Sequence, residues 1–102
     1  MAHAVPTRYV AECFRDGVRE EDLREFGRRI QASVVALGGD EPVRYLGGLL
    51  VIEDEVVLLE FEGPIGPVRR VAEHARIPFG RILRVVHAPW PPNPPDDEEA
   101  QS

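Results

Sequence analysis

Charged side chains lie inside apolar segments of this sequence, where they could form a polar site. Glu12, Glu60 and Arg84 interrupt the segments RYVAECF, VVLLEFE and RILRVV. A charge within a strand costs free energy unless it is paired or reaches water. We expect the three residues to line up across neighbouring strands on one face. They would form either a solvated or ion-paired surface, or a polar pocket at a dimer interface in which the carboxylates bind a cation or a ligand amine.

His74 is the best-placed nitrogen donor, in the segment EHAR. A metal site needs at least three converging donors, and the sequence contains neither HExxH nor CxxC. We therefore expect a half-exposed surface histidine, with a ligand role as the alternative. No cofactor is expected. If a divalent metal binds, Glu12 and Glu60 are the expected ligands, and His74 is at most auxiliary. Such oxygen ligands favour Mg²⁺, Ca²⁺ or Mn²⁺ over nickel.

Cys13 is the one cysteine of the chain. It alternates with Tyr9 and Ala11, so the three share one face of a strand. We expect a buried structural thiol rather than a nucleophile. One cysteine excludes an internal disulfide and fits a reducing cytoplasm.

Two adjacent glycines interrupt another apolar segment, VRYLGGLLVI. Glycine weakens a strand but permits a bulge or a close approach of another backbone. Gly47 and Gly48, with Tyr45 before them, are therefore candidates for lining a ligand pocket or a contact with a partner chain. No glycine-rich phosphate-binding signature occurs in the sequence.

Composition limits the class of protein. The chain has 102 residues, 43% hydrophobic and 29% charged, which predicts one globular domain. The net charge is −6, and Asp96, Asp97, Glu98 and Glu99 contribute four of the negative charges. No basic stripe is present for nucleic acid, and no apolar run approaches the roughly 20 residues that span a bilayer. The N-terminus lacks a signal-peptide pattern, so a cytoplasmic location is expected.

The elements that position these residues follow from periodicity and turn signals. Residues 1–7 are predicted to be a flexible lead-in, 8–87 a domain, and 88–102 a Pro-rich acidic tail, extended or disordered. Apolar residues at steps of 3, 4, 4 and 3 predict an amphipathic helix over 19–37, capped by Gly38 and Gly39. The expected core positions of this helix are Leu23, Phe26, Ile30, Val34 and Leu37.

A second, shorter helix is expected between Pro67 and Pro78, with an apolar face of Val68, Val71, Ala72 and Ala75. The expected strands are 8–14, 43–52, 55–62 and 81–87. The order β-α-β-β-α-β predicts an α+β, ferredoxin-like fold, with two helices on one face of a four-stranded antiparallel sheet in the order 4-1-3-2. The other face needs cover, because the strands supply apolar residues to both faces. A homodimer of the dimeric α/β-barrel type would provide that cover.

The segments YVAECF, VRYLGGLLV, FEGP and VRRVAEHARIPFGRILRVV also carry a family likeness. Together they resemble a family of small bacterial ferredoxin-like proteins of mostly unknown function, one branch of which is described as nickel-binding and dimeric. The resemblance implies the fold and the dimer. In the metal-binding relatives, a histidine follows the aromatic-leucine pair of the second strand, and the third strand often has a cysteine. Here Gly47 and Leu58-Leu59 stand in those places, which weakens the implication of nickel.

The sequence therefore favours a homodimeric, non-catalytic binding protein for a small ligand or metal ion. A cofactor-free enzyme of the dimeric α/β-barrel kind, such as a monooxygenase or a cyclase, is the alternative. Such an enzyme would hold its substrate in a pocket between sheet and helices. A third interpretation is a protein-interaction module that uses the Pro-rich tail.

Overall fold

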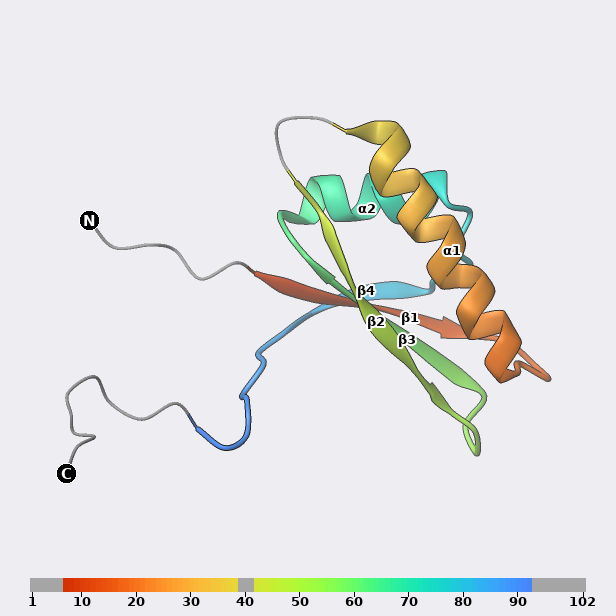
Figure 1. The fold of residues 1–102 in the computed structure, drawn as a ribbon. Helices are drawn as coiled ribbons and strands as arrows, with labels where there is room; N and C mark the ends of the chain where they lie inside the picture. The colour runs from red at the N-terminus through yellow and green to blue at the C-terminus, as the bar shows by residue number, and fades with distance from the viewer. Residues whose placement is uncertain (1–6, 39–41, 93–102) are drawn as a thin grey trace, which may run out of the picture.

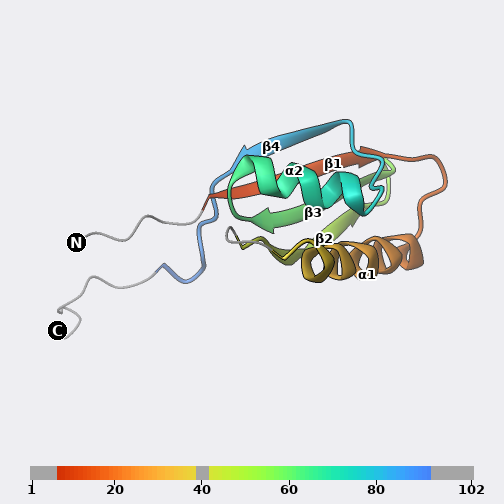
Figure 2. The ribbon, with the colours of Figure 1, turned by 90° about the horizontal axis from the view of Figure 1, so that it is seen from above.

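The chain folds as one sheet covered by two helices. The computed structural model describes residues 7–38 and 42–92. The elements in chain order are β1 (Arg8–Phe14), α1 (Glu20–Leu37), β2 (Arg44–Val51), β3 (Val56–Glu62), α2 (Ile65–His74) and β4 (Arg81–Val85). The strands form one antiparallel sheet in the order β2-β3-β1-β4. Both helices lie on the same face of it (Figures 1 and 2). This α+β architecture confirms the predicted element order and strand order and is compatible with a ferredoxin-like fold.

Some predictions lie outside the described residues. They concern the lead-in up to residue 6, the glycine at position 39 in the cap of the first helix, and the tail from residue 93 onward.

The first turn of α1 contains three acidic residues, whose negative charges are favourable at the positive end of the helix dipole. The backbone N–H of Arg19 donates to Asp22 Oδ2 at 2.8 Å. Phe26 and Ile30 are buried, as predicted. In the last turns of α1, however, the buried residues are not the ones that the sequence predicted. Ser33 is only 3% exposed, whereas Leu37 is 42% exposed. Gly38, with a φ of +54°, ends the helix in a conformation that favours glycine.

α2 begins at Ile65, two residues before the predicted Pro67, and ends at His74. Its expected apolar face is buried over its whole length, at Val68, Val71, Ala72 and Ala75. The prediction that Pro78 ends this helix is wrong. Arg76 has a left-handed φ of +58°, and the N–H of Ile77 donates to the carbonyl of Ala72 at 3.0 Å. This left-handed ending stops the helix before the proline is reached.

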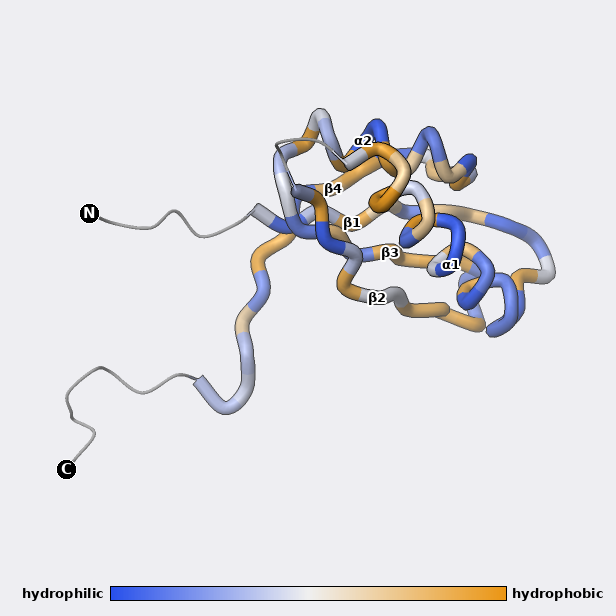
Figure 3. Tube along the Cα trace, turned by 45° about the horizontal axis from the view of Figure 1, so that its top comes forward, coloured by the Kyte–Doolittle hydropathy of each residue, from blue (hydrophilic) through white to orange (hydrophobic). Residues whose placement is uncertain are grey.

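The core lies between the sheet and the helices. Hydrophobic segments run along the strands, while α1 and α2 alternate between hydrophilic and hydrophobic turns (Figure 3). Most side chains of β1 and β3 that face the helices are fully buried, and the largest are Phe61, Leu59 and Val57, whereas Tyr9 is partly buried. They contact Phe26 and Ile30 of α1 and Val68 and Val71 of α2 within one cluster.

The glycine pair of β2 produces both a bulge and a close approach of a neighbouring backbone, the two effects that the sequence analysis allowed. The register against β3 shifts between Tyr45 and Gly47, and Gly47 has a φ of +121°. At Gly48, an added Cβ would lie 2.8 Å from Leu23 Cδ1 and 3.0 Å from the carbonyl oxygen of Leu58. The space beside Gly48 is thus filled by α1 and the neighbouring strand. It offers no room for a ligand, which corrects the pocket interpretation of this position.

Candidate functional site

The sheet face away from the helices carries the two carboxylates singled out in the sequence. Glu12 lies directly between Arg81 of β4 and Leu58 of β3 in the strand register. Its Oε1 accepts a hydrogen bond from Arg81 Nε at 2.6 Å. This hydrogen bond and the negative charge of Glu12 raise the pKa of Arg81. Glu12 is therefore ion-paired with an arginine of the same chain.

Glu60 is paired in the same way. Arg8 Nη1 lies 3.3 Å from Glu60 Oε2, and Arg8 Nη2 lies 3.7 Å from Glu62 Oε2. Arg44 Nη1 adds a second contact to Glu62, at 3.0 Å from Oε1. These pairs make the open face a network of arginines and glutamates. Within one chain, these pairs match the ion-paired surface that the sequence allowed, and a polar pocket between two chains stays a prediction.

Arg84 does not belong to that network, which corrects the expected row of Glu12, Glu60 and Arg84. Arg84 lies opposite Tyr9 in the register, and Tyr9 lies on the helix-covered face. Arg84 consequently points to the side opposite Glu12 and Glu60. Arg81, three residues earlier, occupies the place that the sequence analysis gave to Arg84.

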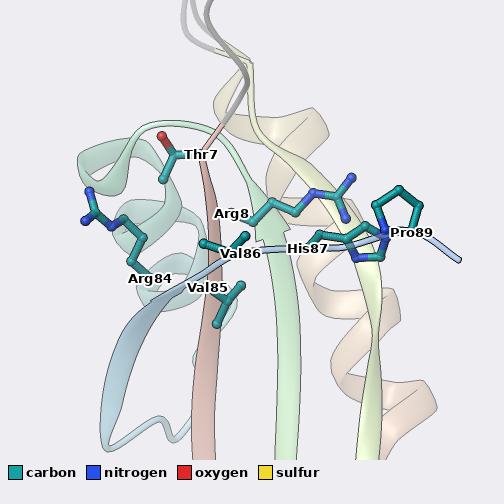
Figure 4. Close-up of a pocket in the computed structure, with 7 residues that line it drawn as sticks. All are labelled: Thr7, Arg8, Arg84, Val85, Val86, His87 and Pro89. Carbon is teal, nitrogen blue, oxygen red and sulfur yellow. The ribbon is translucent and has the colours of Figure 1, made fainter. Parts of the chain in front are cut away.

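A hollow of about 440 Å³ lies at the end of the sheet where β1 begins and β4 ends. Figure 4 shows that Arg8 extends along the sheet toward His87 and Pro89, while Arg84 points the other way, past the edge of β4. The basic groups around this hollow therefore do not converge on one point. Arg8 is in addition paired with Glu60 and Glu62. We assign no ligand to this hollow.

The three candidate metal ligands are separated by the sheet. Glu12 and Glu60 lie on the open face, whereas His74 is the last residue of α2, on the covered side. Within residues 7–38 and 42–92, no group of three or more His, Cys, Asp or Glu side chains could hold a metal ion. The expected pair of carboxylates with an auxiliary histidine is thus not assembled in one chain.

His74 instead contacts a residue that the sequence analysis missed. Its Nδ1 lies 2.9 Å from Ser33 Oγ, across 41 positions of the sequence. Ser33 belongs to α1, three residues after Ile30 and seven after Phe26, so helical periodicity places it on the apolar face. A polar residue at that position was the available signal. His74 itself is exposed.

The remaining candidates, Cys13 and Tyr45, pack in the core. Cys13 is fully buried beside Ala11, as the alternation in β1 predicts. Burial, with a smaller contribution from Glu12, raises the pKa of the thiol from 9.0 to about 11. The ring of Tyr45 lies 5.6 Å from that of Phe61, and burial raises the pKa of its hydroxyl. Neither side chain is prepared to react near neutral pH.

No family model, no curated protein and no solved structure matches this chain. The resemblance to the small ferredoxin-like family therefore stays a prediction. Among the described residues, neither helix has the length and apolar character needed to cross a bilayer.

Proposed function

We propose that the chain is a small homodimeric binding protein without catalytic activity, in which a second copy covers the open face of the sheet. The observation that carries this proposal is the uncovered face itself. Both helices lie on the other side (Figure 2). The open face nevertheless presents a mixture of apolar side chains and neutralised charges. The resemblance to a family with dimeric members points the same way.

The open face carries apolar side chains that a second copy would cover. They are Val10, Phe14, Leu49, Val51, Leu58, Leu83 and Val85. Phe14 is 63% and Leu49 is 66% exposed. Fully burying such a side chain contributes about 1.5–3 kcal/mol. A second copy would bury both residues in each chain.

The charged part of the face does not oppose a second copy. Arg8, Arg44 and Arg81 balance Glu12, Glu60 and Glu62 through ion pairs within the chain. Two such faces can approach without net repulsion, because each face is neutral and its arginines and glutamates can also pair across the interface. This surface has no net charge that would attract a nucleic acid or another strongly charged partner.

The non-catalytic part of the proposal rests on how the reactive groups are held. The Cys13 thiol is buried with a raised pKa. Ser33 is only 3% exposed, although its hydroxyl contacts an imidazole. Glu12 and Glu60 are both bound to arginines. A nucleophile or base must reach the reacting atom of a substrate, and none of these groups is presented in that way.

Native mass spectrometry of protein purified without chelator or tag tests the dimer and the ligand together. We expect twice the chain mass of 11.4 kDa, together with the mass of any retained ligand. Leu58→Lys places a charge at the centre of the proposed interface, so it should weaken dimerisation at least tenfold, equivalent to about 1.4 kcal/mol.

Val35→Lys is the matched control, because Val35 is 74% exposed on α1 and lies away from the open face. It should leave the dimer intact. A wild-type monomer at micromolar concentration would refute the proposed dimer. Equal weakening by both substitutions would place the interface elsewhere.

A further inference from the structure

The groove between α1 and α2 gathers basic side chains around a buried hydroxyl. It has a volume of about 350 Å³ and opens to solvent. Its lining comes from the later turns of α1 and the C-terminal end of α2, and consists of Arg29, Ala32, Ser33, Ala36, His74, Ala75 and Arg76. None of these lining residues is acidic. The three alanines leave the space open because their side chains are short.

Ser33 holds the imidazole of His74 by one of its two nitrogens. Ser33 is 3% exposed, and its Oγ lies 2.9 Å from Nδ1. Among the described residues, the other ring nitrogen, Nε2, makes no hydrogen bond. When the Ser33 hydroxyl donates its hydrogen bond to Nδ1, the neutral imidazole carries its proton on Nε2, which can then donate a hydrogen bond to a ligand.

Arg29 removes the main electrostatic obstacle to an anion at this place. The C-terminal end of a helix carries partial negative charge from its unpaired carbonyl groups. Here Arg29 Nε donates to the carbonyl of Ala75 at 2.9 Å, and Nη2 donates to that of Arg76. These two hydrogen bonds offset the negative end of α2 inside the groove.

Arg76 supplies the free guanidinium. Its side chain is exposed and makes no ion pair with any residue in the described part of the chain. Its backbone adopts the left-handed φ of +58° that ends α2, which places the residue at the rim of the groove beside His74. Guanidinium groups bind carboxylate and phosphate oxygens with paired hydrogen bonds.

We infer that this groove binds a small anion that carries a carboxylate or a phosphate group. Arg76 and His74 contact the anion, and Ser33 is a positioning residue that acts through His74. The inference names the ligand class and site for the binding role proposed above and rests on that role. It does not depend on the dimer, because the groove lies on the helix side and the proposed interface on the opposite face.

Heteronuclear NMR titrations with inorganic phosphate and with acetate, at constant ionic strength, test the inference. We expect saturable shifts at the residues that line the groove, and the anion with the stronger effect identifies the favoured group. Arg76→Asn and His74→Gln should each weaken binding at least fivefold, a loss of about 1 kcal/mol. Asparagine suits position 76 because it tolerates the left-handed conformation.

Ser33→Ala should shift the ¹⁵N resonance of His74 Nδ1 and weaken anion binding, while the helices remain folded by circular dichroism. Weakened binding without that shift would mean that Ser33 only stabilises the helix pair, and would overturn its positioning role.

Arg24→Gln is the matched control for Arg76→Asn. It removes the same charge, but Arg24 lies outside the groove and pairs with Glu20 at 2.7 Å. Its binding curve should match that of the wild type. Absence of saturable shifts with both anions, or equal weakening in Arg24→Gln, would overturn the inference. A monomer that still binds phosphate in the groove would refute the proposed dimer and support the site.

Discussion

Cys13 shows how the fold sets the chemistry of one side chain. The residue lies on the helix-covered face of β1 and is fully buried. Burial disfavours the thiolate, and the neighbouring Glu12 carboxylate disfavours it further, so the pKa of the thiol rises from 9.0 to about 11. The thiol therefore stays protonated near neutral pH and acts as a small apolar group.

We predict that the free energy of unfolding decreases as the pH rises from about 9 toward 11. The unfolded thiol loses its proton near its ordinary pKa of 9.0, whereas the folded thiol keeps it until about 11. The stabilisation is thus complete below pH 9 and is lost as the pH passes 11, and its full size is about 2–3 kcal/mol. Urea unfolding across this range measures it.

Cys13→Ala is the control for this pH dependence, because it removes the thiol and leaves Tyr45 to titrate. The alkaline loss of stability should be smaller in the variant than in the wild type. Identical pH slopes in the two proteins would show that the thiol does not contribute.

At the scale of elements, two glycines lie where α1 packs against β2, and they differ in the space available for an added side chain. Gly27 lies inside α1, and an added Cβ there would meet Tyr45 Cε2 at 3.4 Å, close to an ordinary contact. Gly48 lies in β2, where a Cβ would meet the Leu58 carbonyl oxygen at 3.0 Å and Leu23 Cδ1 at 2.8 Å. The close packing of α1 on β2 therefore requires glycine at position 48 of the strand, but not at position 27 of the helix.

We predict opposite effects for alanine at these two positions. Gly27→Ala should stabilise the protein by about 0.5–1 kcal/mol, because alanine favours the helix and reduces the entropy of the unfolded chain. Gly48→Ala should destabilise it by about 1–3 kcal/mol, because the new methyl group forces the helix away from the strand. Urea midpoints of the two variants measure both effects. Changes of the same sign would contradict this account of the helix–strand contact.

At the scale of the whole molecule, the chain leaves the domain after β4. Val86 is 95% exposed and Trp90 is 87% exposed. Pro91 and Pro92 are exposed as well. The tryptophan ring is therefore exposed and does not dock on the domain. Such a segment makes few contacts that could contribute to folding.

We predict that deletion of residues 91–102 changes the free energy of unfolding by less than about 1 kcal/mol, the size of one ordinary packing contact. A second truncation after residue 88 also removes Trp90 and should have an equally small effect, because its ring is exposed. Urea midpoints of both truncated chains test this. A larger loss in the second truncation alone would show that the tryptophan docks.

Local sequence patterns determined the elements and much of the core. The steps between Phe26 and Ile30, and the alternation of Ala11 and Cys13, predicted buried faces that the structure shows. Gly38 ends α1 as expected. These features were predictable because helical and strand periodicities relate residues that are close in the sequence. The resulting element order, β-α-β-β-α-β, led to the order of strands because that element order is typical of the ferredoxin-like fold.

Only the tertiary structure decided which polar groups meet. Arg84 and Arg81 lie in the same strand, and the register of β4 against β1 determines which of them faces Glu12. A shift of one residue exchanges the two faces, and no local pattern sets that shift when both faces carry apolar residues. The contact between Ser33 and His74 likewise depends on how α1 and α2 pack, across 41 positions of the sequence. Partners of this kind are set by the packing of whole elements, because each element alone leaves its rotation and register free.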